Sequence, residues 1–192
     1  TLGRRGIDAP FLNRNDTRMS PQTFEFVSLQ GIVGDAASPH WKYGFGYFSQ
    51  EKSRNSDEFV SMAEIAGAPD GVDRGVYVGG GTYRNGNWSL GAVDYYSDDI
   101  INIFYTEAKY GLNPAPDVHL LGAVQFAAQN SVGQNLLNGG TSFATNQLGA
   151  KAELGYDTAI LTLAYSVVNP GFAIQTPWSA NPFYTDGQIQ DF

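Results

Sequence analysis

The sequence contains no cysteine, only two histidines and few charged residues, and each shortage excludes a class of site. Without cysteine there is no thiol nucleophile, no thiolate metal site and no disulfide framework. Neither His40 nor His119 has a second ligand at metal-binding spacing, and no nucleophile, base and acid converge in a recognisable motif. We therefore expect a protein that is not an enzyme and that needs neither a metal nor another cofactor.

Basic residues and long apolar runs are also scarce. Eleven Lys and Arg stand against nineteen Asp and Glu, which gives a formal net charge of −8. The basic residues form no cluster of the kind that a phosphate backbone requires, so nucleic acid is excluded as a partner. No run of about 18 apolar residues exists, so the sequence predicts no transmembrane helix.

What the sequence does contain is glycine and aromatic side chains. It has 23 Gly and 14% aromatic residues, and only 16% of the residues are charged. An average soluble domain has about 25% charged residues and about 7% Gly. This composition favours a β-rich protein whose surface does not lie entirely in water.

Apolar and polar residues alternate along many segments, as they do in β-strands with two different faces. The clearest segments are 104–112, 118–128, 147–156 and 159–167, and weaker ones are 23–33, 41–49, 75–84 and 88–97. These are about eight strands of about ten residues, the length that crosses a bilayer when tilted. Helical spacing is closest at 59–65, which is long enough for only a turn or two.

The connections between these segments alternate in length. Short turns are expected at 35–40, 85–87, 113–117 and 156–157, and longer polar stretches at 50–74, 129–142 and 169–192. Short turns on one side and long loops on the other are typical of outer-membrane barrels, as are aromatic residues near both ends of the strands. The aromatic residues expected to form a girdle towards the long loops include Phe48, Tyr95 and Phe143. The pattern predicts an all-β fold, an antiparallel transmembrane β-barrel.

In such a barrel the polar face of each strand lines the water-filled interior. The predicted pore-lining residues are Lys42, Glu107, Lys109, His119, Gln125, Lys151 and Glu153. The opposite face, with Ala108, Ala150, Leu154 and Leu163, would contact lipid. A soluble β-sandwich has the same period of two, however, so alternation alone leaves both folds open.

An extended, charged segment precedes the first predicted strand. Within it Arg14 and Arg18 lie on either side of Asp16, next to Asn13. A loop of this kind that folds into a barrel interior would place fixed charge at the narrowest cross-section and select among solutes. We take Asn13, Arg14, Asp16 and Arg18 as candidate constriction residues, with an ordinary surface loop as the alternative.

The segment Pro10–Glu25 (PFLNRNDTRMSPQTFE) resembles the third-loop region of the OprD family of substrate-specific outer-membrane porins. Three further segments resemble sequences of the same family: Arg54–Met62, Val93–Asn102 and Leu161–Tyr165. Members of that family are barrels of roughly eighteen strands. The resemblance implies that residues 1–192 are a single-domain portion of a larger barrel, with a constriction-loop-like segment at 1–22, strands at 23–168 and a loop at 169–192.

The resemblance implies a passive diffusion channel in the bacterial outer membrane. Its partners would be the lipid bilayer and small water-soluble solutes, carboxylates or amino acids. The resemblance implies a monomer or a loose homotrimer. Two other functions stay open at this point. One is a soluble β-sandwich that binds carbohydrate. The other is a small, complete eight-stranded barrel with a structural or adhesive role, whose interior would be filled by side chains.

Overall fold

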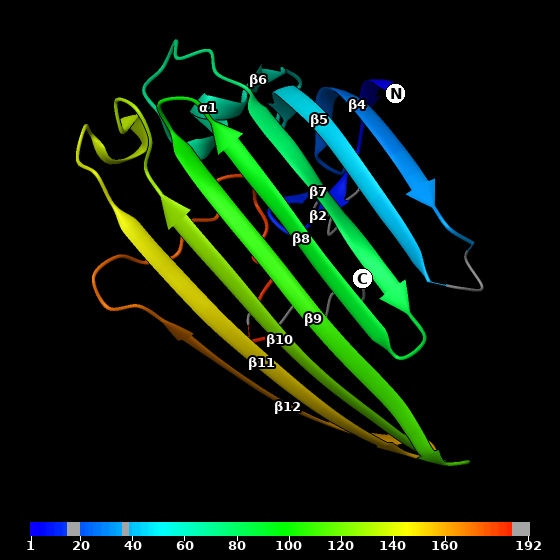
Figure 1. Cartoon of the computed structure of the whole chain (residues 1–192). Coiled ribbons are helices and arrows are strands. Elements are labelled where there is room, and N and C mark those ends of the chain that lie inside the picture. Colours follow the sequence, from blue (N-terminus) through cyan, green and yellow to red (C-terminus); the bar gives the residue numbers. More distant parts are fainter. Residues whose placement is uncertain (15–19, 36–38, 186–192) are drawn as a thin grey trace.

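A computed structural model describes residues 1–14, 20–35 and 39–185. Its main feature is a curved, antiparallel, ten-stranded sheet with the order β1-β4-β5-β7-β8-β9-β10-β11-β12, in which β6 also pairs with β5 (Figure 1). The strands are β1 (Leu2–Arg5), β4 (Thr23–Val33), β5 (His40–Lys52), β6 (Val60–Ser61), β7 (Val76–Asn85), β8 (Trp88–Ser97), β9 (Ile101–Ala115), β10 (Val118–Asn130), β11 (Ala144–Tyr156) and β12 (Ala159–Val168). All eight long strands predicted from the alternation are present.

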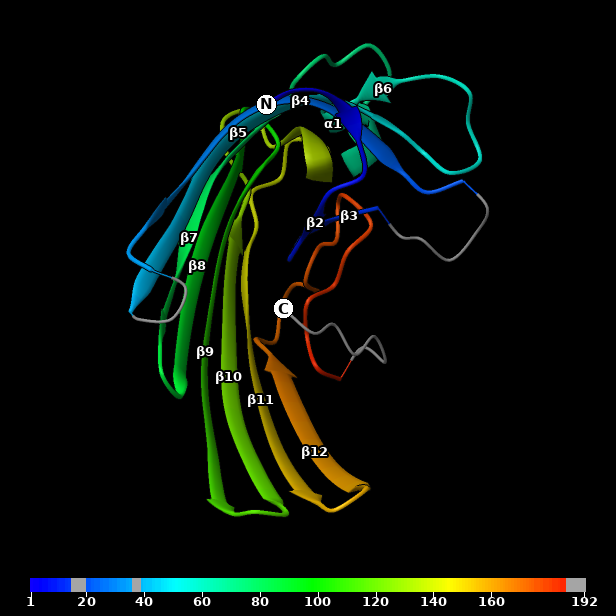
Figure 2. The same cartoon turned by 90° about the vertical axis from the view of Figure 1, so that its right-hand side faces the viewer.

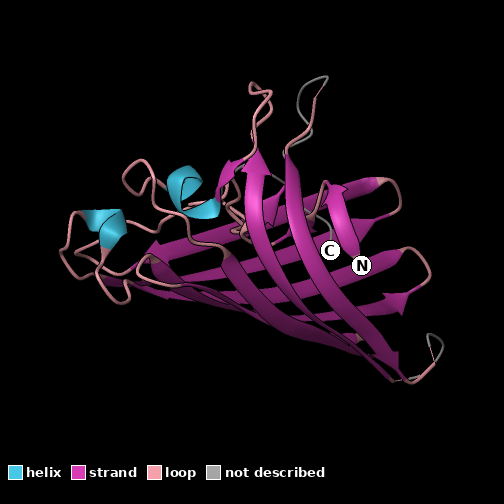
Figure 3. Cartoon of the chain, turned by 90° about the horizontal axis from the view of Figure 1, so that it is seen from above, coloured by secondary structure: helices cyan, strands magenta, loops and turns pink. Residues whose placement is uncertain are grey.

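In the residues that the structure describes, helical structure is confined to two short pieces, α1 (Met62–Ala66) and η1 (Leu136–Asn138). Both lie among the long connections rather than across the sheet (Figure 3). Helix α1 falls where the sequence predicted a turn or two; the Ser61 hydroxyl caps its start by accepting from the Glu64 N–H, and Gly67 ends it with a left-handed φ of 101°. In the described part of the chain, no helix has the length and apolar character needed to span a membrane.

The two rims of the sheet differ as the sequence predicted. At one rim, two-residue turns join β7 to β8, β9 to β10 and β11 to β12. Gly86 and Asp157 have positive φ in two of these turns, the conformation that tight hairpins require. The other rim carries the long connections 53–75 and 131–143.

The two faces of the sheet have opposite character. The convex face carries exposed aliphatic side chains such as Leu148, Leu154 and Leu163, the last of which is 65% exposed. The concave face carries Lys and Glu side chains at the alternate positions, as in β11, where Lys151 and Glu153 face away from Leu154. This arrangement suits lipid on the convex side and water on the concave side.

Aromatic rings on the convex face pair across strands near both rims. Trp41 stacks beside Tyr83 with ring centroids 4.6 Å apart near the short turns, and Tyr47 lies 4.8 Å from Tyr77 towards the other rim. Three other rings of the girdle predicted towards the long loops, those of Phe48, Tyr95 and Phe143, are instead buried in the core. Tyr95 packs against Phe11 and Trp178, Phe143 packs against Phe172, and Phe48 stacks on Phe26 of β4.

Two of the described segments occupy the concave side (Figure 2). One is the hairpin of β2 (Asp8–Ala9) and β3 (Leu12–Asn13), and the other is the chain from 169 to 185 that follows β12. Phe11, Leu12, Trp178 and Phe183 from these segments are almost completely buried. The sequence predicted a loop for 169–192, but it did not indicate that 169–185 lies within the curve of the sheet.

The architecture excludes one of the alternative folds. A β-sandwich has two sheets packed face to face, whereas the long strands described here belong to one sheet. In the described ranges β1 and β12 do not pair, so this sheet is an open part of a barrel. A closed eight-stranded barrel is therefore not formed.

Candidate functional site

The concave face aligns polar side chains from strands that are far apart in the sequence. In an antiparallel sheet, residues paired across strands project to the same face. One row of successive partners contains Lys42, Thr82, Gly91, Glu107, Gln125 and Gly149. The next row contains Arg84, Ser89, Lys109, Ala123 and Lys151. All seven predicted pore-lining residues are on this face.

Two ion pairs lie on the wall formed by β9 and β11. Lys109 Nζ is 3.2 Å from Glu107 Oε2, and Lys151 Nζ is 2.9 Å from Glu153 Oε1. Each pair joins residues two apart on one strand, so both partners point to the concave side. The four charges therefore compensate one another locally.

The segment 181–185 covers this wall. Gln125 donates from Nε2 to the carbonyl oxygen of Pro182 at 2.7 Å and to the Tyr105 hydroxyl at 2.8 Å. The ring of Phe183 lies against Gly149, and a side chain at position 149 would occupy the space of this ring. As a result Gln125 is only 1% exposed.

Tyr184 is inserted between the two ion pairs. Its hydroxyl donates to Glu107 Oε1, and the Lys151 ammonium lies 4.7 Å from the centroid of its ring. Burial raises the pKa of the Tyr184 phenol, and the neighbouring Glu107 carboxylate raises it further. The phenol therefore stays protonated and remains a hydrogen-bond donor to Glu107.

Further contacts hold 172–180 against the sheet and the hairpin. Gln129 and Gln175 form two reciprocal hydrogen bonds, of 2.8 and 2.7 Å, between side-chain and backbone atoms. The Trp178 indole donates to the Met62 carbonyl at 3.1 Å. Leu12 of β3 forms a β-bridge with Ser179. The C-terminal segment is thereby tied both to the sheet and to the hairpin.

The β2–β3 hairpin carries two of the predicted constriction residues. Asn13 lies in β3, and the Arg14 guanidinium is 2.8 Å from the carboxylate of Asp8. The other two, Asp16 and Arg18, lie outside the described residues. The structure thus gives Arg14 the partner Asp8, which the sequence reasoning missed because it considered only Asp16.

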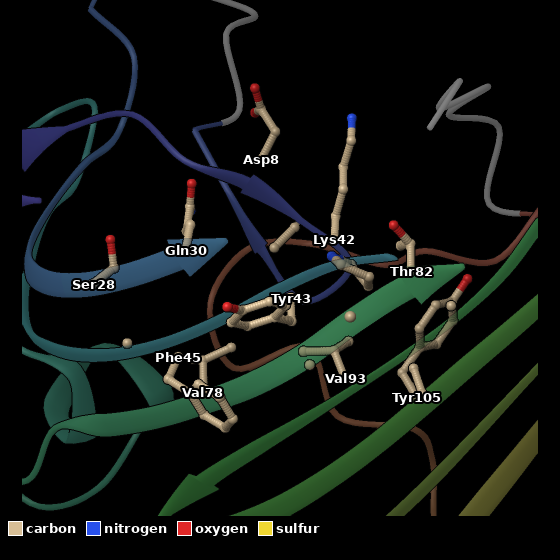
Figure 4. A pocket seen from close by; sticks show the side chains of 18 of the residues that line it. Asp8, Ser28, Gln30, Lys42, Tyr43, Phe45, Val78, Thr82, Val93 and Tyr105 are labelled. Carbon is tan, nitrogen blue, oxygen red and sulfur yellow. The ribbon is translucent and has the colours of Figure 1, made fainter. Parts of the chain in front are cut away.

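A cavity of about 830 Å³ separates this hairpin from part of the sheet. It is lined by β4, β5, β7, β8, β9 and residues 7–10, and not by β10, β11, β12 or 169–185. Ser28, Gln30, Lys42 and Thr82 point from the sheet to the side on which Asp8 of the hairpin lies (Figure 4). The cavity occupies the half of the concave face that the C-terminal segment leaves open.

A second cavity of about 370 Å³ lies nearer the short turns. It shares Arg84, Ser89 and Lys109 with the larger one, so the two meet at this cross-strand row. Beyond the row it is bordered by His119, whose Nδ1 is 2.8 Å from Asn113 Oδ1. Together the cavities follow the concave face from the hairpin to the short-turn rim.

The predicted pore-lining residues divide between the open and the covered halves. Lys42, Glu107, Lys109 and His119 border the cavities, whereas Gln125, Lys151 and Glu153 border neither. The sequence reasoning missed Arg84. This residue lies two positions after Thr82 in β7, so alternation places both side chains on the same face. Residues 1–14, 20–35 and 39–185 contain no group of three or more His, Asp or Glu that could hold a metal ion.

The family model described as outer membrane porin, OprD family, matches residues 1–192. A search of curated proteins found no match. Solved structures from Pseudomonas aeruginosa share the fold, and OccK9 (OpdG) has a TM-score of 0.78 at 18% identity, covering 100% of this chain and 48% of that chain.

Two further Pseudomonas aeruginosa structures contain a ligand. OccK2 (OpdF) in complex with glucuronate has a TM-score of 0.70 at 20% identity, covering 87% of this chain and 43% of that chain. OpdK with vanillate has a TM-score of 0.71 at 18% identity and the same coverage, 87% and 43%. This chain therefore spans about half the length of the solved structures that it matches.

Proposed function

The chain belongs to the OprD family of outer membrane porins, and from this premise we propose that its concave face forms part of the wall of a passive channel. The channel passes small water-soluble solutes across the outer membrane, and the protein catalyses no reaction. The observation that carries this proposal is the pair of connected cavities on the polar concave face of a sheet whose convex face is apolar. Such a sheet separates lipid from a water-filled route.

The charges along the route favour small anions. Asp8 is paired with Arg14, and Glu107 is paired with Lys109. Lys42 lines the larger cavity, and the described residues place no carboxylate within 4.0 Å of its ammonium. A cation in a passage with few waters acts strongly on a passing ion. This uncompensated charge attracts an anion to the open half of the concave face.

We infer that the solutes are small carboxylates rather than amino acids. Glucuronate and vanillate, which are bound by two of the related channels, both carry a carboxylate. A free amino acid would need an available carboxylate for its ammonium group, and Asp8 and Glu107 are already engaged. An organic acid needs only the cation that Lys42 supplies.

Single-channel recording tests both parts of this proposal. The whole protein in a planar bilayer should give discrete, voltage-independent current steps, and its reversal potential in a salt gradient should show a preference for anions. Lys42→Gln should reduce that preference, most clearly at low salt, where screening is weakest. The matched control, Lys42→Arg, keeps the charge and should keep the preference. Absence of current steps from inserted protein would refute the channel, and an unchanged reversal potential in Lys42→Gln would refute the role of Lys42.

The assembly state is a further part of the proposal. A homotrimer is the assembly that we propose to test, and the exposed aromatic and aliphatic side chains of the convex face supply the apolar surface that would contact lipid or a neighbouring copy. Chemical cross-linking in native outer membranes would give a three-chain product for a trimer and a single-chain product for a monomer.

A further inference from the structure

The larger cavity has a floor of glycine backbone. Gly44 and Gly46 of β5, Gly80 of β7 and Gly91 of β8 all line it. Gly44 pairs directly with Gly80, and Gly91 pairs with Thr82. Positions on three adjacent strands that could carry side chains into the cavity thus carry none, and their absence widens the open half of the concave face.

Glycine on the convex face of this part of the sheet is used differently. The rings of Tyr43, Phe45 and Tyr47 of β5 lie over glycines of the adjacent segments, at Gly31, Gly79 and Gly75 respectively, so that a side chain at these glycines would crowd or overlap the ring. There the protein fills the space that glycine leaves. On the concave face the space above Gly44 and Gly91 is part of the cavity.

The backbone does not require glycine at two of the four floor positions. A side-chain carbon at Gly80 would lie 2.5 Å from the carbonyl oxygen of Ala92, so that glycine is needed for close strand packing. At Gly44 and Gly91 the nearest atoms would be ordinary contacts at 3.4 Å, from the side chains of Gln30 and Thr82. Neither glycine has a positive φ. The fold would therefore accept a larger residue at 44 and 91. Glycine at these positions keeps the cavity open and is not required by the backbone conformation.

Among the described residues, neither cavity borders the wall of β11 and β12. The wall of β10 and β11 is covered by 181–185, through the contacts of Gln125, Phe183 and Tyr184. The hairpin lies over the glycine floor at Ile7–Pro10. Solutes that follow the described wall must pass between this hairpin and the floor.

We propose that Gly44 and Gly91 are the size-determining positions of the solute route, because the absence of side chains there leaves the passage between hairpin and floor open. This inference rests on the proposed channel function and adds to it the course of the route. It also predicts that the covered half of the concave face contributes little to conduction.

A cysteine introduced at either position can be modified in the working channel. The sequence has no cysteine of its own, so Gly91→Cys or Gly44→Cys would give this chain a unique thiol. Neutral methanethiosulfonate reagents of increasing size, added to an inserted channel, should lower its conductance in steps that grow with the size of the attached group. For the largest reagent we expect about a twofold fall, since the attached group occupies part of the cross-section through which ions pass. Modification after insertion separates narrowing of the route from a folding defect.

Gly122→Cys is the matched control. Gly122 lies on the convex face of β10 with no atom within 4 Å of an added side chain, so that its substitution should be tolerated and leave the conductance unchanged by the same reagents. If the unmodified protein forms no channel, the proposed function fails. If the unmodified protein conducts, the variants Gly44→Cys and Gly91→Cys are compared with Gly122→Cys. The inference about the glycine floor is wrong if modification changes the conductance of neither Gly44→Cys nor Gly91→Cys more than that of Gly122→Cys.

Discussion

Removal of one hydroxyl tests how the C-terminal segment is held over the concave face. In Tyr184→Phe the ring remains, and with it the contact 4.7 Å from the Lys151 ammonium. The change deletes only the hydrogen bond from the phenol to Glu107 Oε1. Glu107 keeps its ion pair with Lys109 and its hydrogen bond from Gln125, at 3.2 Å each.

The size of the effect follows from the character of this bond. A hydrogen bond to a charged group contributes about 1.5–3 kcal/mol, and we take the lower value because the Tyr184 side chain is only partly buried. A loss of about 1.4 kcal/mol corresponds to roughly a tenfold change in an equilibrium constant. Local opening of 181–185 should therefore become about tenfold more frequent in the variant, without global unfolding.

Hydrogen–deuterium exchange measured by mass spectrometry follows this opening directly. Peptides that cover 172–185 should exchange faster in Tyr184→Phe, whereas peptides from β9 and β10 should not change. Tyr165→Phe is the control, because Tyr165 is 68% exposed on the convex face and its hydroxyl has no part in these contacts. Equal exchange of 172–185 in the wild type and Tyr184→Phe would refute the reasoning that this hydrogen bond holds the segment down.

Two further predictions concern the faces of the sheet and the hairpin. Leu163→Arg places a charge on the lipid-facing surface, and near the midplane of the bilayer this should reduce the free energy of unfolding in vesicles by about 2–4 kcal/mol. Lys151→Arg, on the concave face, should change that free energy little. Equal stability of the two variants in urea titrations would show that the two faces of the sheet are wrongly assigned. Replacement of both Arg14 and Arg18 by Gln should lower the anion-to-cation permeability ratio, with an effect that shrinks as salt rises. An unchanged reversal potential at low salt would indicate that this segment is an ordinary surface loop.

The strands could be predicted because their pattern is local. Alternation indicated a strand at 88–97, and β8 has those bounds. The strand predicted at 104–112 is longer at both ends in the structure, where β9 spans Ile101–Ala115. Two-residue turns and period-two patterning each depend on neighbours in the sequence. The same logic placed Lys151 and Leu154 on opposite faces without knowledge of any long-range contact.

The covering of the concave face could not be predicted, since it depends on contacts between distant residues. The hydrogen bond from Gln125 to Pro182 joins residues 57 apart, and the one from Trp178 to Met62 joins residues 116 apart. No local pattern in 169–185 distinguishes a loop that folds inward from one that extends into solvent. For the same reason Tyr95, which packs against Phe11 of the hairpin at 5.9 Å, was wrongly predicted to belong to the aromatic girdle.

The central claim, that the protein is a passive channel for small anionic solutes, is tested most directly by liposome swelling. Proteoliposomes that contain the whole protein are transferred to an isosmotic solution of a small organic acid such as glucuronate, and the fall in light scattering measures entry of the solute. The account predicts rapid swelling with no energy source, and slow swelling in a sugar too large for the route. Swelling no faster than that of protein-free liposomes, with the protein shown to be inserted, would contradict the claim.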